Sequence, residues 1–507
     1  MNTELEPLVG AYLEGSISAG DMDRLNELLE ADRGARSRFA ECLNLDAALG
    51  EMAAGWMVPE EVSASEPRAR RIRPKALPGV VRVVGIAAAV ALAAVAVIGY
   101  LAEGRSVATE PFATVRDAAG VPGLTRDDTL RREIYRIDTG SVELLTSRGA
   151  KVVIEAPAEF GFESAQTIRL PFGRLAADVP PSAKGFTVIT PDGDAVDLGT
   201  RFGVDVSASS GSRRSGSRRS EIHVFEGEVI ARTGGGGVDE TRSLGTGEAL
   251  TLNLGSGEAR ELRSAAFIQP DEVEELFAGL AAGQLGRSET FGNELRTDET
   301  LIAHLDFESA RHPGIYRTVQ GRWPGSKAPE FVEEGDRLEL DIGGDRAWPR
   351  LTLAAWVRLD RLGAPYQSLL HTDGWSRDNP GQVHWMINRN ATMRLALNSN
   401  TLAPDAEERH GFPDSRTPVL PEHGRWVHLA VVYDSEAKTV RFYLNGEFDK
   451  ETRQEVAHPA RLGPARIGNW DQRDRKLSGR IDELVVLGRA MSDEEVRNLF
   501  DAGNPYR

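Results

Sequence analysis

The stretch VVYDSEAKTVRFYLNGE, residues 431–447, decides the fold of the C-terminal part of the chain. Apolar and polar residues alternate on both sides of the polar segment DSEAK, which indicates two strands with one buried face each. Two such runs around a short polar turn are typical of a β-hairpin. Similar runs surround it, namely LTLAAWVRLD, VHWMINR, MRLALNS, ARIGNW and GRIDELVVLGRAMS. We therefore predict an all-β domain over residues 299–503.

The order and spacing of these segments resemble the LamG-like, concanavalin-type jelly roll, a sandwich of two β-sheets. The segments that carry the resemblance are LTLAAWVRLD, RWVHLAVVYDSEAKTVRFYLNGE, RIGNW and GRIDELVVLGRAMSDEEVRNLF, the last of which ends in a predicted helix. The resemblance implies a domain that binds glycans or surface proteins. Domains of this fold sometimes bind their ligands with calcium.

Two loops at the edge of the predicted sandwich hold the candidate ligand-binding residues, HTDGWSRDNPGQVHW (371–385) and GNWDQRDRK (468–476). Tryptophan rings can stack on sugar rings, and aspartate oxygens can ligate calcium. The candidates are Trp375, Trp385 and Trp470 for a sugar, and Asp373, Asp378, Asp471 and Asp474 for calcium. The sequence leaves an alternative open, in which Trp385 belongs to the core and the aspartates form turns.

The motif E-x-D-x-x-E, formed by Glu334, Asp336 and Glu339, resembles the catalytic signature of jelly-roll glucanases. Retaining hydrolysis needs two carboxyl groups about 5–5.5 Å apart on one face of the active site. The residues between them include Gly335 and Arg337, whereas a catalytic strand would turn apolar residues toward the core. No GxSxG or HExxH motif occurs in the chain. We expect no enzymatic activity.

A second all-β region is predicted over residues 130–265, followed by a linker with a short helix over 266–298. The order GFTVITPDGDAVDLGTRFGVDV, VFEGEV and LGTGEAL resembles the FecR domain, the periplasmic part of a family of single-pass membrane regulators. The resemblance implies signalling to a cytoplasmic sigma factor. Within it, Asp197, Gly199, Thr200 and Phe202 are expected to form a tight turn and a core aromatic rather than a reactive site.

Residues 83–101 carry no charge, and at about 1.5 Å per residue this run roughly matches a bilayer core of ~30 Å. The charged residues that closely follow this run are only Glu103 and Arg105, whereas the segment before it, 68–82, is strongly basic. The basic residues of that segment are Arg68, Arg70, Arg71, Arg73, Lys75 and Arg82. Positive residues stay on the cytoplasmic side. We predict one transmembrane helix in the inner membrane, with the N-terminus cytoplasmic and the C-terminal domains periplasmic or extracellular.

Residues 1–67 show apolar residues at helical spacing on an acidic background, which predicts a small helical unit. Transmembrane anti-sigma factors often place such a unit just inside the membrane. Phe39 and Leu43 lie on the apolar stripe of its third predicted helix and are the candidate contacts for a sigma-factor partner. A zinc site is excluded there, because no histidine precedes His223 and Cys42 is the only cysteine.

The formal net charge of −17 over 507 residues argues against nucleic-acid binding, which needs a basic face. The sequence thus favours a mainly β, membrane-anchored FecR-like regulator with an exported, glycan-binding LamG-like domain. The alternative is a cell-surface adhesion protein that binds carbohydrate and uses the FecR-type domain as a spacer.

Overall fold

The computed structural model describes Arg24 and most of residues 111–506. It omits 209–217, 234–240, 254–255, 271, 273–275, 277–290, 309–310, 377, 408–410 and 471–474. Apart from Arg24, the predicted helical unit, the basic segment and the membrane segment therefore lie outside the described residues, as do Phe39 and Leu43. No helix in the described part is both long and apolar enough to span a bilayer. The described strands all belong to one compact unit, Leu101–Arg507.

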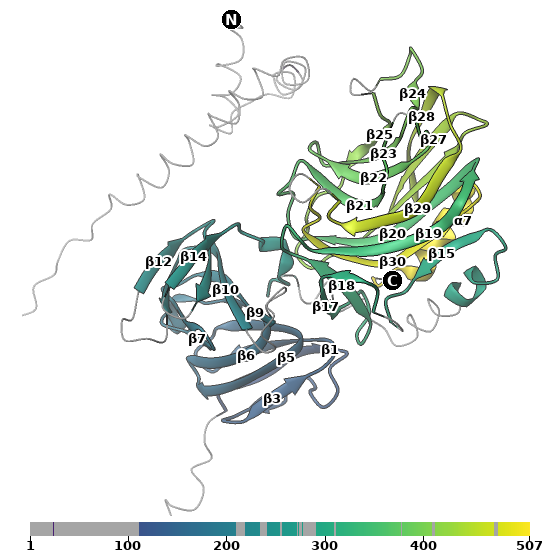
Figure 1. The fold of residues 1–507 in the computed structure, drawn as a ribbon. Coiled ribbons are helices and arrows are strands. Elements are labelled where there is room, and N and C mark those ends of the chain that lie inside the picture. Colours follow the sequence, from purple (N-terminus) through teal and green to yellow (C-terminus); the bar gives the residue numbers. More distant parts are fainter. Residues whose placement is uncertain are drawn as a thin grey trace, which may run out of the picture. The chain divides into compact units, whose positions relative to one another are not determined.

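The described part of the chain is mainly β, as predicted, and its first domain is built on one 14-stranded sheet (Figure 1). Its elements are β1 (Ala113–Ala119), β2 (Thr129–Leu130), β3 (Ile134–Ile137), β4 (Ser141–Thr146), β5 (Lys151–Ser164), β6 (Thr167–Asp178), the 3-10 helix η1 (Pro181–Ala183), β7 (Thr187–Thr190), β8 (Gly193–Asp197), β9 (Arg201–Ala208), β10 (Arg218–Glu226), β11 (Glu228–Thr233), β12 (Thr241–Gly245), β13 (Ala249–Asn253), β14 (Ser256–Arg260) and the 3-10 helix η2 (Ser264–Ala266). The path β12-β11-β8-β7-β6-β5-β4-β1-β2 runs through it. Off this path, β9 pairs with β6, and β10 pairs with β9 and β13.

The DLGTRF motif of this domain forms the predicted turn. The carboxylate of Asp197 accepts hydrogen bonds from the Gly199 amide (2.8 Å) and from the Thr200 hydroxyl. Gly199 has a φ of +105°, which favours a residue without a Cβ. Phe202 follows on β9 and is fully buried in the core. The expectation of a turn and a core aromatic is confirmed.

The second domain is a sandwich of a nine-stranded and a seven-stranded sheet. Its elements are β15 (Leu301–Leu305), β16 (Gly314–Ile315), β17 (Arg317–Gln320), β18 (Lys327–Phe331), β19 (Arg337–Trp348), β20 (Arg350–Leu359), β21 (Tyr366–Thr372), β22 (Val383–Asn388), β23 (Thr392–Leu397), β24 (Thr401–Leu402), β25 (Asp414–Pro418), β26 (Val427–Asp434), β27 (Thr439–Leu444), β28 (Glu447–Val456), β29 (Ala460–Gly468), β30 (Gly479–Leu487) and α7 (Asp493–Gly503). One sheet follows β17-β18-β30-β20-β26-β27-β28-β24, and β15 pairs with β30. The other follows β16-β19-β29-β21-β22-β23-β25.

The hairpin predicted from residues 431–447 is present as β26 and β27, paired from Asp434↔Thr439 to Leu429↔Leu444. Asp434 closes its turn by accepting from the amides of Glu436 and Ala437. The predicted closing helix is α7, which begins after Ser492. The Ser492 hydroxyl accepts from the Glu495 amide, and the Glu495 carboxylate accepts from the Ser492 amide, so a capping box fixes its start.

Buried ion pairs connect the first domain to the sandwich. Three of them join Arg174 Nη2 to Glu330 Oε1 (2.8 Å), Arg263 Nη1 to Asp360 Oδ2 (3.1 Å) and Arg358 Nη1 to Glu155 Oε1 (3.0 Å). The chain just after β14 is part of this contact, because the Ala266 carbonyl accepts from both Arg174 and Arg358. We call this contact the seam. It fixes the two β-domains to each other through charged side chains.

Candidate ligand-binding site

An aromatic cavity of about 200 Å³ lies on the seven-stranded sheet, and we call it the aromatic pocket. Its lining residues come from β21, β22, β23 and three loops. They are Tyr366, Trp375, His384, Met386, Arg394, Ala396, Phe412, Trp470 and Arg475. Trp375 and Trp470 stand on the two loops that the sequence singled out. The structure therefore brings together two of the three predicted tryptophans, although they are far apart in the chain.

The alternation of β22 explains how this pocket forms. Successive side chains of a strand point to opposite faces. Val383, Trp385 and Ile387 pack into the core of the sandwich, so His384 and Met386 face the other way and line the pocket. Trp385 is completely buried and belongs to the core, which corrects its place among the ligand-binding candidates.

The rings of the pocket are in direct contact with one another. Trp375 stacks on His384 with 4.1 Å between the ring centroids and 30° between the planes. Trp470 is tilted against His384, with 4.7 Å between the ring centroids and 59° between the planes. Phe412 meets Trp375 edge-on at 6.4 Å. Trp375, His384, Trp470 and Phe412 thus form a continuous aromatic surface.

Asp373 positions a tryptophan of this pocket. Its Oδ1 accepts a hydrogen bond from Trp470 Nε1 at 3.2 Å, and its Oδ2 lies 3.6 Å from Arg466 Nη2. Asp378 is exposed, whereas Asp471 and Asp474 lie outside the described residues. No group of three or more potential metal ligands occurs in the described part of the chain. Both carboxylate oxygens of Asp373 already have a partner, the Trp470 indole N–H and the Arg466 guanidinium. The described residues therefore do not fit a calcium site.

Two buried histidines beneath the tryptophans are neutral. Burial, with Arg475 nearby, lowers the pKa of His384 to about 3. The pKa of His371 is lowered as well, mainly by burial and to a smaller extent by the nearby His384 and Arg475. Its Nδ1 is hydrogen-bonded to the Ser368 hydroxyl. His384 Nε2 has no hydrogen-bond partner among the described residues. The floor therefore offers flat, uncharged rings.

Two arginines border the pocket. The Arg394 guanidinium is held by Asp414 through two hydrogen bonds of 2.6 and 2.7 Å. The Arg475 guanidinium lies over the Tyr366 ring at 4.7 Å and near Trp470 at 5.4 Å. These contacts fix the aromatic walls from the side. The pocket surface itself remains mostly aromatic.

The E-x-D-x-x-E motif is not arranged as a pair on one strand. Glu334 lies exposed in a turn before β19, and Glu339 lies exposed on β19, where it pairs with Arg337 at 2.9 Å. Asp336 is buried and accepts from the amides of Val332 and Glu333. Its role is to close the turn. That the protein has no enzymatic activity stays a prediction.

Sequence reasoning missed several pocket residues, above all His384, Met386 and Phe412. The signal for two of them was present, because placing Trp385 in the core puts its neighbours on β22 on the opposite face. Phe412 carries no such signal. It reaches the pocket from the loop before β25, and only the folded sheet brings that loop beside Trp375.

Family models match both β-domains. Residues 135–230 match the family described as FecR protein, and residues 344–497 match the concanavalin A-like lectin/glucanases superfamily. The chain therefore carries a FecR domain and a C-terminal LamG-like domain, as the two resemblances implied. A search of curated proteins found no match.

Solved structures resemble part of the chain. A native heptameric SAP-like pentraxin from Limulus polyphemus is 17% identical, with a TM-score of 0.27 over 34% of this chain and 80% of its own. Domain 4 of AbnA, a GH43 extracellular arabinanase from Geobacillus stearothermophilus, in complex with arabinotriose, is 19% identical, with a TM-score of 0.29 over 39% and 98%. The IT-sialidase CBM40 of Ruminococcus gnavus bound to α2,3 sialyllactose is 16% identical, with a TM-score of 0.26 over 34% and 96%.

Proposed function

We propose that this protein is a membrane-anchored, FecR-like signalling regulator whose exported LamG-like domain binds a carbohydrate in the aromatic pocket. The observation that carries the ligand class is the pair of indole rings, Trp375 and Trp470, that both contact the neutral His384. Aromatic rings offer broad apolar faces at little cost in conformational entropy. The C–H face of a sugar ring fits such a surface.

The size of the pocket sets the scale of the ligand. A volume of about 200 Å³ is below the ~300–1,000 Å³ of pockets that hold drug-sized ligands. This is room for one sugar ring rather than for a long segment of a chain. The polar groups at its edge, which include Arg394 and Arg475, would meet the hydroxyl groups of that ring. We therefore expect recognition of a terminal or single exposed residue of a glycan.

The regulatory part of the proposal rests on the FecR domain and on the N-terminal sequence. The basic segment 68–82 and the uncharged run 83–101 support a single-pass anchor with the N-terminus in the cytoplasm. The acidic segment 1–67 would then meet a cytoplasmic sigma factor, with Phe39 and Leu43 as contacts. The seam favours this proposal over the adhesion alternative, because a mere spacer has no need of specific buried ion pairs with its neighbour.

The carbohydrate part is tested by binding of residues 101–507 to an array of mono- and oligosaccharides, followed by titration of the best ligand. Trp375→Ala and Trp470→Ala should each weaken binding by about tenfold to a hundredfold, since contacts of central aromatic residues typically contribute ~2 kcal/mol or more. Phe448→Ala is the matched control, because Phe448 is 49% exposed on β28 and lies outside the pocket. Equal affinity of all three variants would refute the pocket as the site.

The regulatory part is tested in cells. Residues 1–67 with a cytoplasmic tag should capture a sigma factor, and Phe39→Asp or Leu43→Asp should abolish the capture. A reporter active only outside the cytoplasm, fused after residue 507, should give a signal. Failure of capture at low salt, with a folded bait and with glycan binding intact, would favour the adhesion protein.

A further inference from the structure

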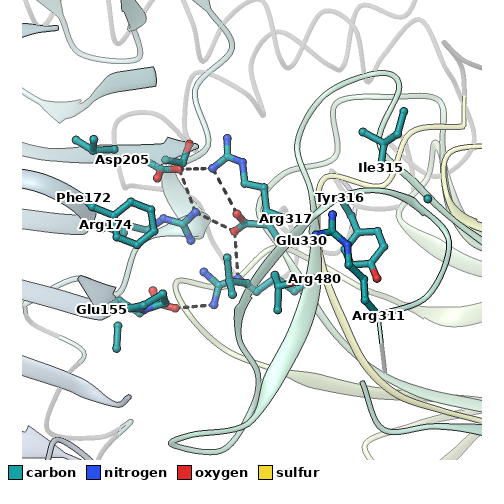
Figure 2. Close-up of a pocket in the computed structure, with 18 residues that line it drawn as sticks. Glu155, Phe172, Arg174, Asp205, Arg311, Ile315, Tyr316, Arg317, Glu330 and Arg480 are labelled. Carbon is teal, nitrogen blue, oxygen red and sulfur yellow. Dashed lines mark hydrogen bonds and ion pairs between the residues drawn. The ribbon is translucent and has the colours of Figure 1, made fainter. Parts of the chain in front are cut away.

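A cavity of about 490 Å³ opens at the seam, and we call it the seam cavity (Figure 2). Three of its charged residues come from the FecR domain, on β5, β6 and β9, and three from the sandwich, on β17, β18 and β30. These are Glu155, Arg174, Asp205, Arg317, Glu330 and Arg480. Apolar walls complete it, including Phe172, Ile315 and Tyr316. Its volume is in the range of pockets that hold small organic ligands.

The carboxylates of the cavity are neutralised from several sides. Asp205 Oδ2 accepts from Arg174, Arg263 and Arg317 at 3.0 to 3.1 Å. Glu330 Oε1 accepts from Arg174 at 2.8 Å and from Arg480 at 3.1 Å. Burial alone would raise the pKa of both acids, but these arginines outweigh burial and hold both values well below their usual range.

Glu155 completes this pattern on the FecR side. Burial would raise its pKa, but Arg358 and Arg480 lower it to about 2. The carboxylates are therefore ionised at neutral pH, and each has at least two guanidinium partners. A further anion in the cavity would meet neutralised acids rather than free negative charge.

Two guanidinium groups at the cavity keep donors available. Arg317 engages both Asp205 and Glu330 through one nitrogen, Nη1, and no hydrogen bond of its Nη2 occurs among the described residues. Arg311 is exposed at the mouth, where its guanidinium lies 5.4 Å from the Tyr316 ring. It makes no ion pair within the described part of the chain. Ile315, which is 40% exposed, stands beside them.

We propose that the seam cavity binds a small organic anion, a carboxylate with an apolar body, by pairing the carboxylate with Arg311 and Arg317. Guanidinium–carboxylate pairs are strong and directional, and the apolar body would lie against Phe172, Ile315 and Tyr316. Because the lining comes from both domains, such a ligand stabilises the joined arrangement of the FecR domain and the sandwich. The site is an effector site, separate from the aromatic pocket.

Octanoate is the probe, titrated calorimetrically into residues 101–507, with octanamide as its uncharged counterpart. We expect one saturable site for octanoate and binding at least about tenfold weaker for octanamide. Arg311→Met should weaken octanoate binding by about tenfold or more. Arg389→Met is the matched control, because Arg389 is likewise exposed over a tyrosine ring, 5.9 Å from that of Tyr366, but lies outside the cavity.

Two further variants make the test decisive. Ile315→Asp changes an exposed residue, so the fold should persist, and the new carboxylate at the mouth should abolish octanoate binding. Trp470→Ala should leave octanoate binding unchanged, which separates this site from the glycan pocket. Absence of saturable octanoate binding, or equal binding by the Arg311→Met and Arg389→Met proteins, overturns the proposal.

Discussion

The aromatic pocket and the seam cavity differ in the side chains that form them, which are neutral rings in the first and buried charged groups in the second. The pocket belongs to one domain, and neutral rings such as Trp375, His384 and Trp470 form its surface. The seam cavity belongs to two domains, and buried charges from six strands form its floor. Removing one ring from the pocket should lower ligand affinity but leave the fold intact. Removing one charge from the buried network should destabilise the fold, because each remaining charge has lost part of its compensation.

The largest expected effect follows from removing one charge of the seam. Glu330→Leu leaves Arg174, Arg317 and Arg480 without their shared carboxylate, and we expect it to lower the free energy of unfolding by about 4 kcal/mol. Urea unfolding of residues 101–507 measures this. Glu339→Leu is the control, because Glu339 is exposed in its pair with Arg337 and should cost about 0.5 kcal/mol or less.

Glu330→Gln shows whether the stability lost in Glu330→Leu is due to the charge or to the shape of the side chain, since glutamine keeps the volume and one acceptor oxygen. Glycan binding in the aromatic pocket should be the same in all three variants as long as the sandwich is folded. If Glu330→Leu costs no more than Glu339→Leu, the seam is not a compensated network and the comparison fails.

Acidification should destabilise both regions, but over different pH ranges. The pKa values of His384 and His428 fall to about 3 by burial, from about 6.5 in the unfolded chain. The unfolded state therefore binds more protons, and stability falls as the pH drops below 6.5. Each histidine should cost about 2 kcal/mol at pH 5 relative to pH 7.5. Asp482, whose pKa burial raises to about 6, gains about 1 kcal/mol in the same range.

These three groups together predict a loss of about 3 kcal/mol between pH 7.5 and pH 5. His371 and His223, whose pKa values burial also lowers, add to this loss, and urea unfolding at both pH values measures the total. The seam acids act at lower pH, because the pKa of Glu155 is lowered to about 2 and its stabilisation disappears only as the pH falls through about 4.5 and below. His384→Asn should reduce the loss at pH 5. An unchanged pH profile in that variant would mean that His384 does not titrate as a buried neutral ring.

The same contrast explains how far the sequence predicted the structure. The hairpin of β26 and β27, the turn at Asp197 and the loops with Trp375 and Trp470 are local patterns, and local patterns determine strands and turns. The seam has no local pattern. Arg174 and Glu330 are 156 residues apart, and each is a charged residue within a strand, where a charge normally indicates a solvated face. Only the packing of the two domains shows that both are buried.

The smallest expected effect concerns Asp373, which touches the pocket only through Trp470. Replacing it with asparagine keeps the size of the side chain and one oxygen that can accept from Trp470 Nε1, but removes the charge near Arg466. The indole should stay near its place with more freedom, so we expect glycan affinity to fall by about threefold, less than the loss in Trp470→Ala. Asp373→Ala, which removes the acceptor, should fall between the two. If calcium restored or strengthened binding in the wild type and not in Asp373→Asn, the carboxylate would be a metal ligand and not a positioning residue. Equal affinity of Asp373→Ala and the wild type would show that Trp470 is held by its ring contacts alone.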